Sequence, residues 1–148
     1  MANEHYYDID LVWRSDRMGE VSSPVLNEKI EVVTPPEFPK GIAGKWSPEH
    51  FFTAAVSSCF MTTFLAVAEN SKLEFVSLEV KAKGKLEMVE GKFMMSEVEL
   101  KPELVITKQD DQERAFRILN KSEAACLISN SIKSKIVFVP EIKIAQTA

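Results

Sequence analysis

The sequence predicts an α+β fold, in which an antiparallel sheet packs against two central helices that each carry one of the two cysteines. Three patterns predict it. Residues 76–88 alternate apolar and charged side chains, which is typical of a strand with one face in water. An apolar stretch at 51–68 follows a helix-start signal at Ser47 and Pro48. The order strands, helix, hairpin, helix, strands indicates one α+β domain over residues 1–148.

Short strands are expected near both ends of the chain. Residues 6–13 alternate, with apolar side chains at odd positions, and predict a half-buried strand. The proline-rich segment 34–41 cannot continue a ladder and is expected to be a loop. Further strands are expected at 21–26, 30–33, 136–139 and 142–144.

The first helix is expected to run from the Ser47 cap to about Asn70. Because apolar residues surround it on most sides, it should be central or covered by a partner subunit.

A turn at Glu90 and Gly91 is expected to join the strand 76–88 to a partner at 93–107. Pro102 indicates an edge or a bulge in that partner strand. A second helix should begin at Asp110 and carry Cys126 on its apolar face.

Composition and charge argue against nucleic-acid binding, a membrane segment and a metal site. The net charge is −4 and the pI about 5.3, without a basic stripe, which argues against nucleic acid as a partner. The N-terminus lacks a signal-peptide pattern, and serine and threonine interrupt the stretch 51–68. A core helix and a cytoplasmic protein without a membrane segment are therefore expected. Two cysteines with His5 and His50 offer no metal-ligand spacing, so no metal or cofactor is expected.

The two cysteines are the candidate reactive groups. In a reducing compartment such a pair is either core packing or transient redox chemistry. Cys59 lies deep inside its helix and needs a positive neighbour to ionise, for which Arg14 and Arg17 are candidates. Glu49 could hold such an arginine, although about 15 Å of helix separates it from Cys59. A long arginine side chain could bridge part of this gap; otherwise the helix bends, or the acidic and basic groups come from a second subunit.

Three motifs resemble those of the OsmC/Ohr family of thiol peroxidases. The segment 47–60, with Pro48, Glu49 and Cys59, resembles the family's first-cysteine helix. Arg17 and Gly19 match its Arg-x-Gly turn, and the segment 126–130 is similar to its Cys-Pro-x-Ser-x motif. The resemblance covers nearly the whole chain. The departures are Ser47 in place of Asn, Leu127 in place of Pro, and Ser57 and Ser58 in place of the small apolar residues before Cys59.

The resemblance implies a role for each site residue. Cys59 would be the peroxidatic thiolate and Cys126 the resolving thiol that forms a disulfide with it. Arg17 would activate Cys59 and polarise the peroxide, while Glu49 would orient Arg17. An intertwined homodimer with two active sites at its interface is implied as well.

The implied function is a cysteine-based peroxidase that reduces organic hydroperoxides in oxidative-stress defence, regenerated by a dithiol or low-molecular-weight thiol. The phenylalanines near Cys59 suggest an apolar approach for such substrates. A different class stays open: a dimeric protein that binds a small hydrophobic ligand, with both cysteines as packing. A scaffold role without chemistry is a third alternative.

Overall fold

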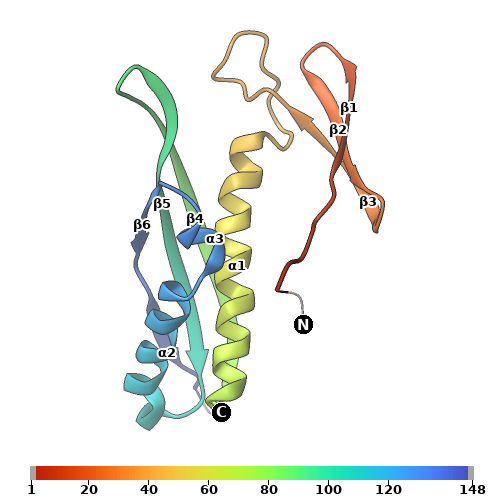
Figure 1. Cartoon of the computed structure of the whole chain (residues 1–148). Helices are drawn as coiled ribbons and strands as arrows, with labels where there is room; N and C mark the ends of the chain where they lie inside the picture. The colour runs from red at the N-terminus through yellow and green to blue at the C-terminus, as the bar shows by residue number, and fades with distance from the viewer. Residues whose placement is uncertain (1–2, 147–148) are drawn as a thin grey trace. The chain divides into compact units, whose positions relative to one another are not determined.

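The computed structural model describes residues 3–146, which form two compact units divided between Phe51 and Phe52. Figure 1 labels most of the elements of both units. Helix α1 (Pro48–Asn70) begins in the first unit and continues in the second. The α+β class, with antiparallel hairpins and helices, is confirmed. The organisation as one domain over residues 1–148 stays a prediction.

The first unit contains an antiparallel sheet of β1 (Asp10–Ser15), β2 (Met18–Ser23) and β3 (Leu26–Val33). The prediction of a strand at 21–26 is wrong in its bounds, because Pro24 and Val25 form the turn between β2 and β3. The strand expected at 6–13 begins only at Asp10. A Cβ on Gly19 would approach the Val12 carbonyl oxygen to 2.9 Å, so this close pairing of β1 and β2 needs glycine.

The second unit is built on a long hairpin, to which two short strands and the remaining helices are added. Its strands are β4 (Phe75–Val89), β5 (Lys92–Ile106), β6 (Lys135–Phe138) and β7 (Glu141–Ile144). Its other helices are η1 (Gln109–Asp111), α2 (Gln112–Ala124) and α3 (Leu127–Asn130). The hairpin is antiparallel, whereas β6 and β7 both pair parallel to β5, a feature that the sequence analysis did not predict.

Pro102 lies in a central strand, so the prediction of an edge or a bulge at this residue is wrong. It pairs with Val80 on one side of β5. On the other side it falls between the stretch that pairs with β6, which ends at Leu100, and the stretch that pairs with β7, which begins at Glu103. A residue without an N–H is tolerated at this break in the ladder.

The hairpin contains a bulge, because Lys85 pairs with Glu97 and the next residue, Leu86, pairs with Met95, which leaves Ser96 of β5 as the extra residue. Met88, near the turn of the hairpin, is 55% exposed although it continues the apolar positions of β4. The alternation in the sequence predicted the strand correctly but could not reveal the bulge.

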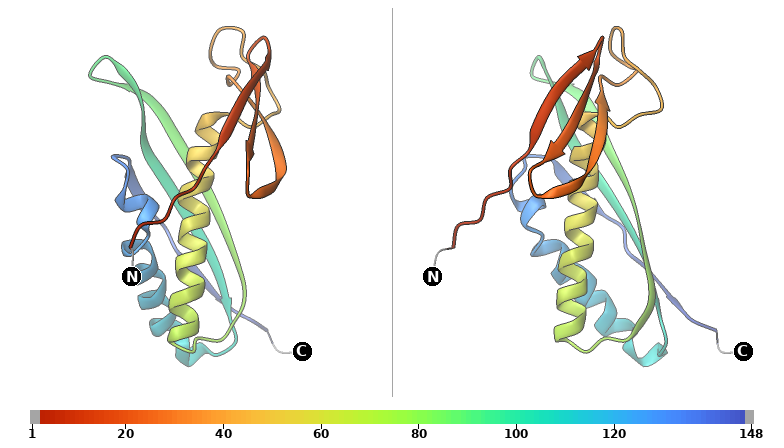
Figure 2. Two further views of the ribbon diagram at one scale, coloured as in Figure 1. Left: turned by 45° about the vertical axis from the view of Figure 1, so that its right-hand side comes forward. Right: turned by 90° about the vertical axis from the view of Figure 1, so that its right-hand side faces the viewer.

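Helices α1 and α2 cover the same face of this sheet. The buried side chains of β5 occupy even positions and share one core with both helices. In this core Phe60 contacts Phe138 and Phe64 contacts Phe75, each with ring centroids 5.3 Å apart. Figures 1 and 2 show α1 extending along the hairpin with α2 beside it.

Gly84 lets α1 approach β4 closely. A Cβ at this position would lie 2.2 Å from Thr53 Oγ1 and 2.7 Å from the Met95 methyl carbon. Because neither distance is compatible with a real contact, glycine is required where the helix crosses the strand.

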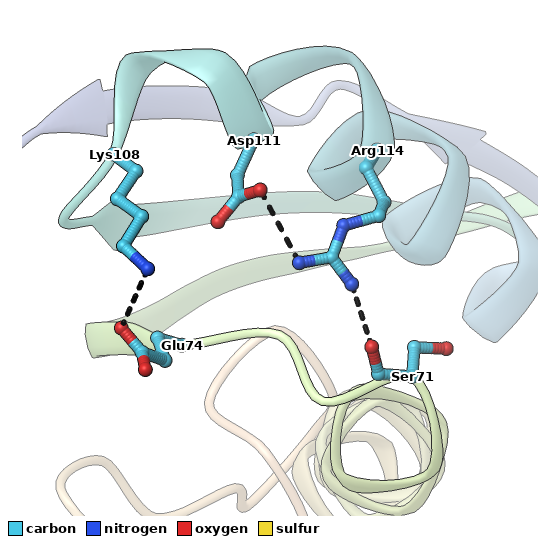
Figure 3. Close-up of polar contacts among 5 residues, drawn as sticks. All are labelled: Ser71, Glu74, Lys108, Asp111 and Arg114. Atoms are coloured by element: carbon cyan, nitrogen blue, oxygen red, sulfur yellow. Dashed lines mark hydrogen bonds and ion pairs between the residues drawn. The ribbon is translucent and has the colours of Figure 1, made fainter.

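Polar contacts fix the C-terminal end of α1 (Figure 3). Arg114 donates from Nη1 to the Ser71 carbonyl oxygen at 2.6 Å, and its Nη2 contacts Asp111 Oδ1 at 3.2 Å. Lys108 and Glu74 form a further ion pair at 3.7 Å. These contacts tie the loop after α1 to the beginning of α2.

One flank of α1 remains open in the single chain. Met61 and Leu65 are 42% and 43% exposed, although Phe60 and Phe64 beside them are fully buried. Among residues 3–146, α1 is the one helix long and apolar enough to be a candidate membrane span by length and composition. Core helices meet the same criterion, and the absence of a membrane segment stays a prediction.

Candidate functional site

The second unit brings the two cysteines together. Cys59 lies on α1 and is 9% exposed, while Cys126 lies between α2 and α3 and is fully buried. Both are reduced, and their thiols are in hydrogen-bond contact. The sequence had placed them on two separate helices, without a means to show that they meet.

The prediction that Cys126 lies within the second helix is wrong. α2 ends at Ala124, and Cys126 has extended backbone angles, φ −65° and ψ 112°, before α3 begins at Leu127. The N–H of Asn130 then closes the first turn of α3 on the Cys126 carbonyl oxygen at 3.0 Å. The helix therefore breaks at the second cysteine even though leucine, and not proline, follows it.

Hydrogen-bond donors surround the Cys59 sulfur. Burial is the largest single influence on this thiol and opposes ionisation. It is outweighed by the Ile128 N–H, the Cys126 thiol, the Thr63 hydroxyl and the Leu127 N–H, which all favour the thiolate. The pKa of Cys59 is consequently lowered below its ordinary value.

The pKa of Cys126 is shifted in the opposite direction. Burial, the largest influence, raises it, and the neighbouring Cys59 sulfur raises it further. The hydroxyl and N–H of Ser129 act against this shift without cancelling it. Ser129 Oγ is buried and makes no hydrogen bond to nitrogen or oxygen, so the Cys126 sulfur is the polar atom that it faces.

The pair is thus asymmetric: the pKa of Cys59 is lowered and that of Cys126 is raised. Because the thiolate is the nucleophilic form of cysteine, this asymmetry favours Cys59 over Cys126 as a nucleophile. The four donors that act on Cys59 all belong to the second unit. The activation of Cys59 by a positive side chain stays a prediction.

The first unit brings Arg17 and Glu49 together. Both line a cavity of about 480 Å³, whose walls are otherwise largely apolar and include Leu11, Trp13 and Phe38. Arg17 occupies the turn after β1, and Glu49 the first turn of α1, where its carboxylate oxygen Oε1 is buried. The four predicted site residues therefore form two pairs, one in each unit.

Backbone hydrogen bonds hold this cavity in place. The Thr34 N–H donates to the Arg17 carbonyl oxygen at 3.1 Å, and the Val33 N–H donates to that of Trp46 at 2.8 Å. Ser47 caps α1, because its Oγ accepts the His50 N–H at 3.2 Å. The cap at Ser47 is thereby confirmed, and His50 completes it through a 2.7 Å contact between Nδ1 and Ser47 Oγ.

Arg14 forms an ion pair outside the cavity. Its Nη2 pairs with Glu20 Oε1 at 2.9 Å across β1 and β2, and it is not among the residues that line the cavity. Of the two arginines that the sequence offered, Arg17 is thus the one beside Glu49.

Thr63, Ile128 and Leu127 were not among the predicted site residues. Thr63 could have been found, because it follows Cys59 by four residues and so shares its helix face. The N–H groups of Ile128 and Leu127 could not have been found in this way, because every residue except proline has a backbone N–H and the residue type does not show which of them faces a sulfur. Among residues 3–146, no group of three or more His, Cys, Asp or Glu side chains could hold a metal ion.

Comparisons with known proteins agree with this architecture. A family model described as OsmC-like protein matches residues 41–141. The uncharacterized protein YmaD of Bacillus subtilis is 26% identical over 141 residues, which are 92% of this chain and 91% of that protein.

Solved structures share the fold. An OsmC-like protein of unknown function from Vibrio cholerae superposes with a TM-score of 0.83 at 22% identity, covering 93% of this chain and 99% of that one. An organic hydroperoxide resistance protein from Elizabethkingia anophelis gives 0.77 at 24% identity, covering 98% and 100%. OhrB of Bacillus subtilis, also an organic hydroperoxide resistance protein, gives 0.66 at 20% identity, covering 94% and 98%.

Proposed function

Since the chain belongs to the OsmC-like protein family, we propose that it is a thiol-dependent peroxidase that reduces organic hydroperoxides in defence against oxidative stress. The observation that carries the proposal is the asymmetric contact between Cys59 and Cys126, in which one thiol is acidified and the other is not. Two structural relatives named organic hydroperoxide resistance proteins support the substrate class. A cytoplasmic location, where thiols are kept reduced, suits this chemistry.

The proposed reaction has two steps. The Cys59 thiolate attacks the terminal oxygen of the peroxide, the O–O bond breaks, and the departing alkoxide takes up a proton to become an alcohol. Cys59 is left as a sulfenic acid. The Cys126 sulfur then attacks the Cys59 sulfur, its proton leaves with the hydroxyl as water, and a disulfide forms. A dithiol or low-molecular-weight thiol is oxidised in returning both cysteines to the thiol form.

We assign to Arg17 the stabilisation of negative charge on the peroxide oxygens as the O–O bond breaks. A guanidinium offers several fixed donors for such a group. Glu49 lines the same cavity, and a carboxylate there holds the guanidinium in orientation. Their apolar surroundings suit a substrate with a hydrocarbon part better than hydrogen peroxide. Of the phenylalanines near Cys59 that suggested an apolar approach, Phe60 and Phe64 are fully buried in the core.

We propose that the working form is a homodimer. The N-terminal segment exposes large apolar side chains to an extent that a monomer rarely shows: Tyr6 80%, Tyr7 88%, Leu11 66% and Trp13 74%. The open flank of α1 adds Met61 and Leu65. Light scattering is expected to give twice the 16.7 kDa mass of the chain at micromolar concentration. A mass of one chain at that concentration would remove the dimer from the proposal.

The two-thiol mechanism is tested by intact mass after brief exposure to cumene hydroperoxide without reductant. We expect a loss of two hydrogens, with the peptides that contain Cys59 and Cys126 linked. In the Cys126→Ser variant the same treatment should instead add one oxygen to Cys59. An unchanged mass for the unsubstituted chain would contradict the peroxidase proposal.

A second candidate function is the binding of a small hydrophobic ligand, with both cysteines as packing. The apolar cavity of the first unit favours it, because about 480 Å³ is within the range of ligand pockets. Inert core cysteines would react slowly with an alkylating reagent at pH 6 and would survive cumene hydroperoxide unchanged. Fast alkylation of Cys59 at that pH supports the peroxidase instead.

A further inference from the structure

We infer that His50 is a positioning residue for Glu49 in the proposed peroxide site, and that it acts through reciprocal hydrogen bonds with Ser47. The inference deepens the proposed function and rests on it, because Glu49 matters there as the carboxylate that orients Arg17. All four residues belong to the first compact unit.

Two hydrogen bonds run in opposite directions between Ser47 and His50. The His50 N–H donates to Ser47 Oγ at 3.2 Å, and the Ser47 N–H donates to His50 Nδ1, also at 3.2 Å. This reciprocal pattern is that of a capping box, in which the N-cap residue and the third residue of a helix each accept the other's backbone N–H. Glutamate or glutamine usually supplies the second acceptor, whereas in this chain it is an imidazole nitrogen.

These contacts determine which imidazole nitrogen carries the proton. A backbone N–H can only donate, so Nδ1 is the unprotonated acceptor and Nε2 carries the proton of the neutral ring. The 2.7 Å contact between Ser47 Oγ and Nδ1 agrees with this assignment, because the hydroxyl can donate to Nδ1 while its oxygen accepts the His50 N–H. His50 therefore provides an acceptor that an aliphatic side chain would lack.

Glu49 lies within the turn that these bonds close. It is the second residue of α1, and neither its N–H nor the nitrogen of Pro48 has a carbonyl partner within the helix. The N–H of Phe51 is the first to reach back, to the Ser47 carbonyl oxygen at 3.0 Å. The bonds between Ser47 and His50 therefore hold the backbone on both sides of Glu49, and with it the point from which the carboxylate meets the cavity.

The surroundings make these bonds hard to replace. Ser47 is fully buried, so water cannot take the place of His50 as the acceptor of its N–H. Trp46 packs edge to face on the imidazole, with ring centroids 6.1 Å apart, and stacks on Phe51 at 5.5 Å. The Trp46 carbonyl oxygen also accepts the N–H of Val33, a residue that lines the cavity. The cap is thereby joined to the cavity wall as well as to the helix.

The experiment compares the unsubstituted chain with His50→Ala and His50→Gln. Glutamine restores a side-chain acceptor of the kind that capping boxes commonly have at this position, whereas alanine removes it. We expect His50→Ala to lower kcat/KM for cumene hydroperoxide roughly three- to tenfold, as the loss of one ordinary hydrogen bond predicts, and His50→Gln to recover most of it. Alkylation of Cys59 by iodoacetamide should have the same rate in all three chains, because that reaction involves no peroxide.

Equal kcat/KM values in His50→Ala and His50→Gln would overturn the inference. A loss in His50→Ala that slows the alkylation of Cys59 to the same extent would also overturn it, because the substitution would then act on the whole fold and not on Glu49. Should His50→Ala fail to fold, as judged by circular dichroism, His50→Leu takes its place, since leucine keeps more of the packing against Trp46 and still lacks the acceptor.

A readout on Glu49 itself needs no turnover. The ¹³C NMR signal of its carboxyl carbon, identified with Glu49→Gln, should move in His50→Ala and return toward its original position in His50→Gln. If the unsubstituted chain did not reduce cumene hydroperoxide, the proposed function would be wrong, and this signal would still decide the inference. A signal that stays in place in His50→Ala would overturn the positioning role, whether or not the chain is a peroxidase.

Discussion

Replacing Cys59 by serine is expected to abolish the reduction of cumene hydroperoxide, with a fall in rate of at least about 10⁴-fold, as for other lost nucleophiles. A serine hydroxyl is not ionised near neutral pH, and its oxygen cannot accept the peroxide oxygen as sulfur does. The thiolate stabilised by the Ile128 and Leu127 amides would have no counterpart in the variant. The rate is measured by loss of the peroxide in the presence of a dithiol.

The Cys126→Ser variant provides the matched control for this prediction. It keeps the nucleophile, so it should consume about one equivalent of peroxide per chain before turnover slows. Ser58→Ala, at an exposed position beside Cys59, should leave the rate unchanged. Full activity in Cys59→Ser would mean that the cysteine chemistry has been wrongly assigned.

Replacing Arg17 by alanine is expected to lower the rate by about 10²-fold, the usual cost of losing one charge-stabilising donor in a transition state. The structure offers a matched control in Arg14, which is of the same type and lies three residues earlier. Its guanidinium forms an ion pair with Glu20, and Arg14 does not line the cavity. Arg14→Ala should therefore retain most of the activity. Both are measured as kcat/KM with cumene hydroperoxide.

Lysine at position 17 sharpens this test. Lysine preserves the positive charge but lacks the planar guanidinium with its several donors. The kcat/KM of Arg17→Lys should therefore lie between that of Arg17→Ala and that of the unsubstituted chain. A larger loss in Arg14→Ala than in Arg17→Ala would transfer the assigned role to Arg14. Since alkylation of Cys59 with a neutral reagent involves no peroxide, it separates peroxide binding from thiol activation in these variants.

Much of the fold was predictable, because its main signals are local. The alternation over 76–88 and the glycine turn after it predicted the hairpin, and Ser47 with Pro48 predicted where α1 begins. Features that depend on distant partners were missed. The bulge beside Leu86 leaves no mark in either strand, and the parallel pairing of β6 and β7 depends on how the chain returns to β5.

The site was predictable to a similar degree. Of the four residues chosen from the sequence, Cys59 and Cys126 are in contact, and Arg17 and Glu49 line one cavity. The hydrogen-bond donors around Cys59 were mostly missed, because two of them are backbone groups. The sequence placed Cys126 inside the second helix because α2 ends without glycine or proline, the residues that usually mark the end of a helix.

The complete burial of Cys126 has a consequence for the regeneration of the proposed disulfide. A reductant must attack one of the two sulfurs and expel the other, and the sulfur with the lower pKa departs more readily. Attack on Cys126 would expel Cys59, the better leaving group, but the Cys126 sulfur is shielded from solvent. Attack on the more accessible Cys59 would expel the poorer leaving group. Accessibility and leaving ability thus favour opposite sulfurs, so recycling proceeds either by the less favourable attack on Cys59 or through a local opening around α3 that exposes Cys126.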